Sequence, residues 1–135
     1  MINSPEQISH IRTATMGFTG IICLAYASLV VITGQPQPMS PWIPGVAGVL
    51  TSIVIFGSFM AAGSKNAVMA TDELYASQQS KAAQIGYWVA LAMYPIFGLL
   101  IMQDLLSLSL AFPIMATLTG AAYLLPFAYL TCSRT

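Results

Sequence analysis

Charged side chains are scarce in this sequence, and their scarcity argues against an ordinary soluble domain. Only 6% of the 135 residues are Asp, Glu, Lys or Arg, whereas 57% are hydrophobic. A soluble domain carries about 25% charged residues, because polar side chains must cover its core. The formal net charge is zero, so the chain also lacks the basic excess of proteins that bind nucleic acid. The hydrophobic side chains must face another apolar medium, and a lipid bilayer provides one.

Residues that bind metals, haem or redox partners are also few. Cys23 lies within an apolar run and Cys132 lies near the C-terminus, so the bilayer depth separates the two sulfurs and we expect no disulfide. His10 is the single histidine, which excludes a haem held by two histidines of one chain. We therefore predict no catalytic site, no cofactor and no metal, and we expect the protein not to be an enzyme.

Long hydrophobic runs are what the sequence has instead. Four of them, at about 15–32, 43–62, 85–102 and 108–130, contain no Lys, Arg, Asp or Glu. Each approaches the ~20 residues that a helix needs to cross ~30 Å of hydrocarbon. A lone strand would leave its backbone polar groups unpaired in lipid, so helices are expected. The predicted fold class is all-α: residues 1–135 form one polytopic membrane domain with four transmembrane helices in an up-down bundle.

The third helix is expected to begin before its apolar run. Thr71, Asp72 and Glu73 form an N-terminal cap signal, and no Gly or Pro follows until Gly86. We therefore predict a helix over 72–102 with a cytoplasmic extension. Pro95 and Pro126 fall within the third and fourth helices, where a missing backbone donor should bend the helix.

The connections and the basic residues predict an orientation. The connection at 34–44 contains four prolines, and the connection at 103–107 is so short that the third and fourth helices must form an antiparallel hairpin. Neither connection contains a basic residue. All the Lys and Arg residues lie before the first apolar run, between the second and third, or after the fourth: Arg12, Lys65, Lys81 and Arg134. The positive-inside rule then places both termini in the cytoplasm.

Small residues at helical spacing mark faces on which helices can approach closely in lipid. The third helix has Ala82, Gly86 and Ala90, each four residues apart, and the second has Gly48 and Ser52. These faces could hold the bundle together or could dock a partner. Together with the acidic pair Asp72 and Glu73, they are the candidate partner-contact residues.

A short motif surrounds the expected start of the third helix. It consists of Thr71-Asp72-Glu73-Leu74, spaced alanines and then Gly86-Tyr87-Trp88. This motif, within about thirty residues, resembles a pattern in small bacterial four-helix inner-membrane proteins of unknown function, where an Asp-Glu pair also precedes the third helix. Where basic residues often follow that pair, this chain has Ala76, Ser77, Gln78 and Gln79. The resemblance implies a multi-pass protein of the bacterial inner (cytoplasmic) membrane and no defined activity.

Two functions of different kinds remain open. The first is a non-catalytic accessory subunit that contributes helix packing and stabilisation to a larger membrane complex. The second is a homo-oligomeric transporter or channel for a small neutral solute, which ranks lower because the apolar runs hold no ionisable group. Lipid or pigment contacts are a further hypothesis, based on the aromatic residues Trp42, Trp88, Tyr94, Phe97, Tyr123 and Phe127.

Overall fold

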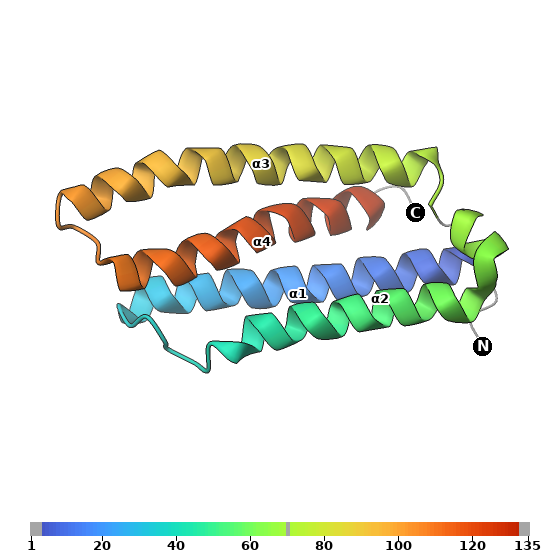
Figure 1. Ribbon diagram of the computed structural model, residues 1–135, viewed down its shortest axis with the longest axis horizontal. Coiled ribbons are helices and arrows are strands. Elements are labelled where there is room, and N and C mark those ends of the chain that lie inside the picture. The colour runs from blue at the N-terminus through green and yellow to red at the C-terminus, as the bar shows by residue number, and fades with distance from the viewer. Residues whose placement is uncertain (1–3, 70, 133–135) are drawn as a thin grey trace.

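The computed structural model describes residues 4–69 and 71–132, and this part of the chain is helical with no strand (Figure 1). The helices are α1 (Pro5–Thr33), α2 (Trp42–Met69), α3 (Glu73–Met102) and α4 (Leu108–Cys132). All four are long and apolar enough to cross a membrane. The predicted all-α class is confirmed, and the length and composition of the four helices indicate an integral multi-pass membrane protein. Arg134 lies outside the described residues.

Helix α1 begins ten residues before the predicted start at residue 15, because its first turn is fixed by a polar cap. The Ser4 side chain accepts a hydrogen bond from the Gln7 backbone N–H at 3.3 Å, and Pro5 occupies the first helical position. At the other end Gly34 adopts a left-handed φ of 62°, and its N–H donates to the Val30 carbonyl.

Helix α2 is broken at Gly63, where φ is 79° and ψ is 160°. These angles lie outside the helical region and favour glycine. The break follows the predicted end of the second span at residue 62. Beyond it, the segment 64–69 turns across the end of the molecule toward the start of α3 (Figure 1).

Helices α3 and α4 form the predicted antiparallel hairpin. The Asp72 carboxylate accepts a hydrogen bond from the Tyr75 N–H at 2.9 Å, so α3 begins where the cap signal indicated. The turn at 103–107 includes Asp104 in a left-handed conformation, with φ of 55°. Pro95 and Pro126 lie inside α3 and α4 without ending either helix.

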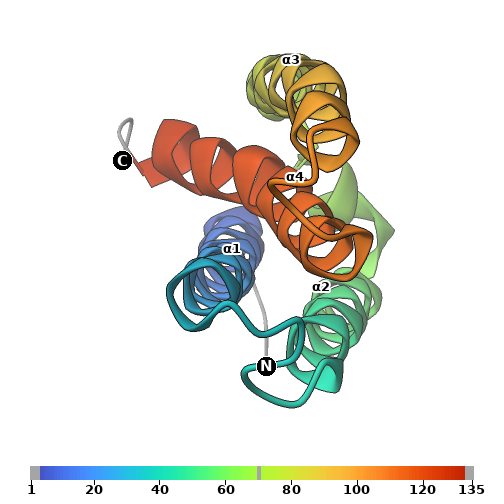
Figure 2. The same ribbon diagram turned by 90° about the vertical axis from the view of Figure 1, so that its left-hand side faces the viewer.

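The helices pack in the order α2–α1–α4–α3 (Figures 1 and 2). The extensive contacts are those of α1 with α4, of α3 with α4 and of α1 with α2. Helices α2 and α3 therefore lie on opposite flanks of a central α1–α4 pair. Most of their hydrophobic side chains face outward, as a lipid environment requires.

Close approach of the helices depends on particular small residues. A Cβ atom added at Gly86 of α3 would lie 3.2 Å from the Tyr123 Cβ and 3.5 Å from the Tyr123 Cα. One added at Gly20 of α1 would lie 2.9 Å from the Leu125 side chain. The backbones of both helix pairs can approach this closely only where a side chain is absent.

We expect Gly86→Val to lower the free energy of unfolding by about 1–3 kcal/mol relative to Gly98→Val, because overpacking forces α3 away from α4. Gly98 lies on the same helix, and an added Cβ there meets nothing within 4 Å. The two variants therefore share the change in helix propensity. Reversible unfolding in mixed micelles, followed by circular dichroism, measures the difference, and equal stabilities would contradict the α3–α4 packing.

Candidate functional site

Arg12 is a charged residue buried among three helices. It is 2% exposed. Its guanidinium carbon lies 3.8 Å from the centroid of the Tyr75 ring of α3 and 5.8 Å from that of the Phe127 ring of α4. The two rings meet edge to face with centroids 5.8 Å apart. A desolvated cation over an aromatic face is attracted by the ring quadrupole, so this contact joins α1 to α3 and α4.

The depth of Arg12 follows from helix length. Helix α1 has 29 residues, which at 1.5 Å per residue gives about 43 Å, about 13 Å more than the hydrocarbon thickness. Arg12 lies about 10 Å from the first helical residue, so the excess length can keep its charge at the edge of the bilayer. Asp72, the cap of α3, contributes an attractive electrostatic interaction with Arg12.

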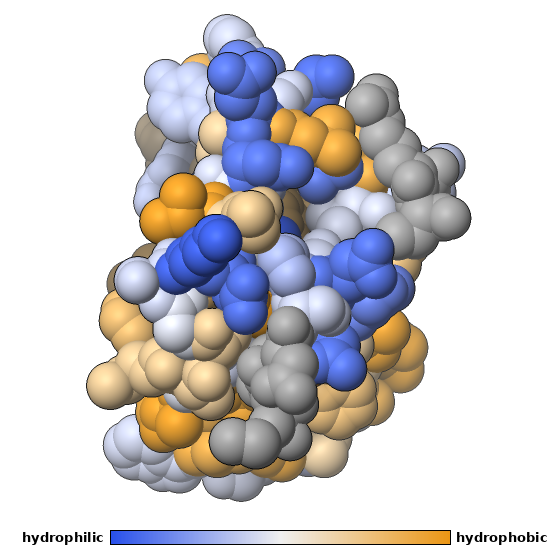
Figure 3. All heavy atoms as spheres, turned by 90° about the vertical axis from the view of Figure 1, so that its right-hand side faces the viewer, coloured by the Kyte–Doolittle hydropathy of each residue, from blue (hydrophilic) through white to orange (hydrophobic). Residues whose placement is uncertain are grey.

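Polar groups close the same end of the molecule around a cavity of about 200 Å³, whose lining includes Glu6, Arg12, Asp72 and Gln78. The Gln78 amide nitrogen donates to the Leu130 carbonyl at 3.2 Å. Hydrophilic side chains gather on this end face (Figure 3). The cavity, here called the Arg12 pocket, brings together residues from α1, α3 and α4, and both signs of charge line it.

Thr131 completes this polar network at the end of α4. Its hydroxyl donates to the Gln78 side-chain oxygen at 3.3 Å and lies 2.9 Å from the Phe127 carbonyl. The last carbonyls of a helix lack intrahelical partners. The Gln78 amide therefore satisfies one of these carbonyls, that of Leu130, as a helix cap would, and the Thr131 hydroxyl contacts the Gln78 side chain.

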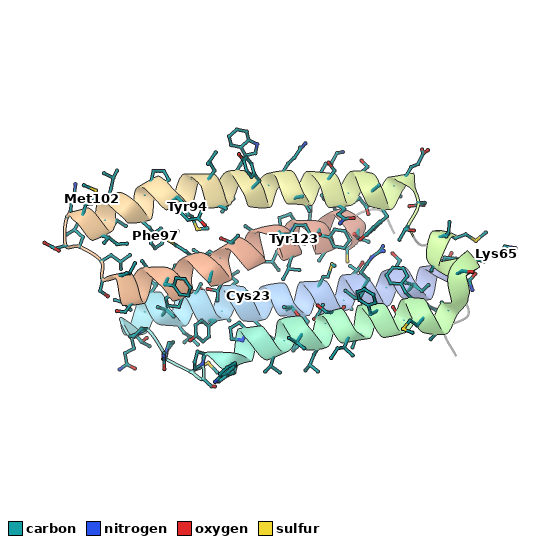
Figure 4. The ribbon with its side chains drawn as sticks, viewed as in Figure 1. Cys23, Lys65, Tyr94, Phe97, Met102 and Tyr123 are labelled. Atoms are coloured by element: carbon teal, nitrogen blue, oxygen red, sulfur yellow. The ribbon has the colours of Figure 1, made fainter. Side chains whose placement is uncertain are left out.

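A second cavity, of about 640 Å³, lies at the opposite end of the molecule. It is enclosed by α1, by the connection 34–41 and by the first turns of α2 and α4, and four prolines contribute to its lining: Pro36, Pro41, Pro44 and Pro113. We call it the proline pocket. Tyr26 and Cys23 of α1 line its inner wall. Figure 4 shows Cys23 on the side of α1 that faces α4, and a Cβ added at Gly120 of α4 would lie 3.6 Å from the Cys23 sulfur.

A third hollow, of about 570 Å³, runs between α1 and α2 and is lined mainly by hydrophobic side chains, including Phe18, Trp42 and Leu50. At its base the hydroxyls of Thr19 and Thr51 are 2.6 Å apart. This hydrogen bond joins α1 to α2 inside the apolar region, where interhelical hydroxyl contacts add to close packing. The hollow is a lipid-facing groove between two packed helices.

The candidate partner-contact residues fall into two groups. On α3, Ala82 and Gly86 are buried and Ala90 is half-buried, and Gly86 packs on Tyr123 of α4. The helix packing that their spacing favours is thus made within the chain.

The α2 residues of this set lie away from the packed face. An added Cβ at Gly48 would meet nothing within 4 Å, and Ser52 is exposed, with its hydroxyl donating to the Gly48 carbonyl at 2.9 Å. Helix α2 packs on α1 through Ala47 and Thr51 instead. Asp72 and Glu73 are exposed at the start of α3. Partner contact at these exposed positions stays a prediction.

The aromatic residues proposed to contact lipid or pigment are also divided. Trp42, Trp88 and Tyr94 are exposed. Phe127 is fully buried and stacks on Tyr123, with centroids 6.4 Å apart. Phe97 points from α3 toward α4 (Figure 4) and packs on the buried cluster of Tyr26, Val30 and Ile114.

Sequence reasoning missed Arg12 as a buried contact and Tyr26 as a cavity residue. A signal for Arg12 was present: Ser4 and Gln7 have the spacing of a capping box, which extends α1 toward the N-terminus and brings Arg12 into the helix. No equivalent signal marks Tyr26, because its burial depends on which face of α1 meets α4.

Between residues 4 and 132, residue 70 excepted, no group of three or more His, Cys, Asp and Glu is placed so that it could hold a metal ion. No known family, no curated protein and no solved structure matches this chain.

A double-mutant cycle tests the Arg12 contact. We expect the variants Arg12→Met and Tyr75→Leu to show a coupling energy of about 1–2 kcal/mol, because a desolvated cation–π pair contributes about this much. Thermal or detergent unfolding of the four proteins gives the coupling. Additive effects of the two substitutions would show that Arg12 and Tyr75 do not stabilise each other.

Proposed function

We propose that this chain is a non-catalytic accessory subunit of a larger membrane protein complex, and that α2 is the helix that packs on a neighbouring subunit. Its contribution is packing surface and stabilisation of the assembly. The observation that carries the proposal is the set of small residues on α2 that no described part of the chain uses.

The glycines of the four helices differ in what surrounds them. Added Cβ atoms at Gly20, Gly86 and Gly120 would meet a neighbouring helix within 4 Å, whereas at Gly48 and Gly57 of α2 they would meet nothing. A glycine inside a helix lowers helix stability by roughly 0.5–1 kcal/mol relative to alanine. In lipid that loss is offset where another backbone packs against the glycine, and on α2 the missing backbone is supplied by a partner.

The surface around Gly48 fits such a contact. Ser52 lies one turn further along α2, and its hydroxyl is already bonded to the Gly48 carbonyl. It therefore presents a small side chain without an unsatisfied polar group. Helix α2 has its extensive packing with α1 alone, so a partner helix can reach this surface from the side.

The proposed membrane arrangement has both ends and the α2–α3 connection in the cytoplasm. Arg12, Lys65 and Lys81 belong to the end of the molecule where α1 and α3 begin and α2 ends (Figure 1). The connections at the opposite end have no Lys or Arg. This charge asymmetry supports an up-down topology with cytoplasmic termini, and the resemblance around Asp72 and Glu73 supports the bacterial inner membrane.

Photocrosslinking tests the partner surface. A photoreactive amino acid placed at Ser52 should crosslink, in native membranes, to a different membrane protein that also co-purifies in stoichiometric amount. The control position is Ala92, which is exposed on α3 at a comparable distance from the helix end, and there we expect lipid adducts. Recovery of the protein alone and monodisperse would contradict the proposal.

Recovery of a homo-oligomer crosslinked through Ser52 would also contradict an accessory role. It would favour the alternative of a transporter or channel for a small neutral solute. Flux of such a solute into liposomes, compared with protein-free liposomes, then tests the alternative directly.

The orientation is tested with single cysteines at Gln37 and Ser64 in a protein whose own cysteines are replaced. A membrane-impermeant thiol reagent added to intact cells should label the cysteine at residue 37 at least about tenfold faster than that at residue 64, because a hydrocarbon layer separates the two compartments. Equal labelling of both positions would overturn the proposed topology.

A further inference from the structure

Tyr26 has a hydroxyl group in an unusual position. The residue is 4% exposed, and its hydroxyl oxygen has no hydrogen-bond partner in the described part of the chain. Tyr26 also lines the proline pocket. A buried hydroxyl without a partner is unfavourable, and a tyrosine in such a place usually finds one.

A second group without its regular partner belongs to a residue that lines the same pocket. Pro113 is in the second turn of α4 and has no N–H, so the Ser109 carbonyl four residues earlier lacks its regular helical donor. Both residues line the pocket, and Ser109 is exposed. The Thr117 hydroxyl cannot supply the missing donor, because it is directed to the Pro113 carbonyl at 2.7 Å.

The shape and lining of the pocket restrict what it could bind. Its volume of about 640 Å³ lies within the range of roughly 300–1,000 Å³ typical of small-molecule sites. Its lining is formed by uncharged side chains, including Phe112 and Ala116. A charged ligand would lose its hydration there without an opposite charge to replace it.

We infer that the proline pocket binds an uncharged amphiphile with a hydroxyl head group and an apolar body. On binding, the buried Tyr26 hydroxyl turns into the cavity and donates a hydrogen bond to the ligand hydroxyl, which in turn donates one to the Ser109 carbonyl. The apolar body lies along Phe112 and Ala116. Neutral lipids of the glyceride or prenyl-alcohol kind have this chemistry, and the surrounding membrane is their source.

The experiment uses the full chain in phosphatidylcholine nanodiscs with a photoactivatable diacylglycerol, and intact-mass spectrometry measures the adduct. Unlabelled 1,2-dioctanoylglycerol is the competitor. Its 3-acetate is the matched control, because it keeps the glyceride body and has no hydroxyl to donate. We expect saturable labelling that the alcohol competes at least about fivefold more effectively than the acetate, as loss of one hydrogen bond predicts.

Two variants locate the site. Tyr26→Phe removes only the hydroxyl, and we expect affinity for the photoprobe to fall about fivefold. Gly45→Leu fills the pocket from α2, where an added Cβ meets nothing within 4 Å, and we expect labelling to be lost. Gly98→Leu on α3 introduces the same side chain outside the pocket and should label like the original chain.

Non-saturable labelling, equal competition by the acetate, or unchanged labelling of both Tyr26→Phe and Gly45→Leu would each overturn the inference. Circular dichroism in the same nanodiscs verifies that the variants are folded. If Gly45→Leu does not fold, the comparison of Tyr26→Phe with the original chain decides.

Discussion

The guanidinium of Arg12 is the contact on which the arrangement of the helices most depends. A charge that has left water must keep its compensating groups, and here these are the ring faces of Tyr75 and Phe127 on two other helices. Rotation of α1 by one residue, or a slide along α4, would separate the cation from both rings. Close packing of small residues sets the distance between the helices, whereas Arg12 sets their register.

The central α1–α4 pair differs from the flanking helices in what its residues contact. Its residues include the buried Arg12, Tyr26 and Phe127. It forms most of the lining of the proline pocket and shares the lining of the Arg12 pocket with α3. Helices α2 and α3 each have one extensive neighbour, and their outer faces are adapted to lipid. The proline pocket therefore lies mainly on the central pair, whereas the proposed docking surface lies on the flanking helix α2.

The sequence predicts the helices of this protein better than their contacts. The four spans are evident because hydrocarbon tolerates only long uncharged helices, and Asp72 marks the start of α3 because a carboxylate stabilises free N–H groups. The early start of α1 was missed because the predicted apolar run begins only at about residue 15, after Arg12, while the helix extends back to its cap at Ser4. The burial of Tyr26 and the exposure of Gly48 depend on helix rotation, which the abundance of small residues leaves undetermined.

The short turn between α3 and α4 constrains how the protein enters the membrane. The five-residue connection 103–107 is too short to span the bilayer. Helix α3 therefore cannot cross the membrane while α4 is still on the side from which insertion begins, and the two helices must be inserted together as a hairpin. With both termini cytoplasmic, as proposed, Asp104 is the single charge in the two connections that must be translocated. Membrane insertion of this chain therefore requires insertion machinery that accommodates two helices at once, and it does not require export of a long polar segment.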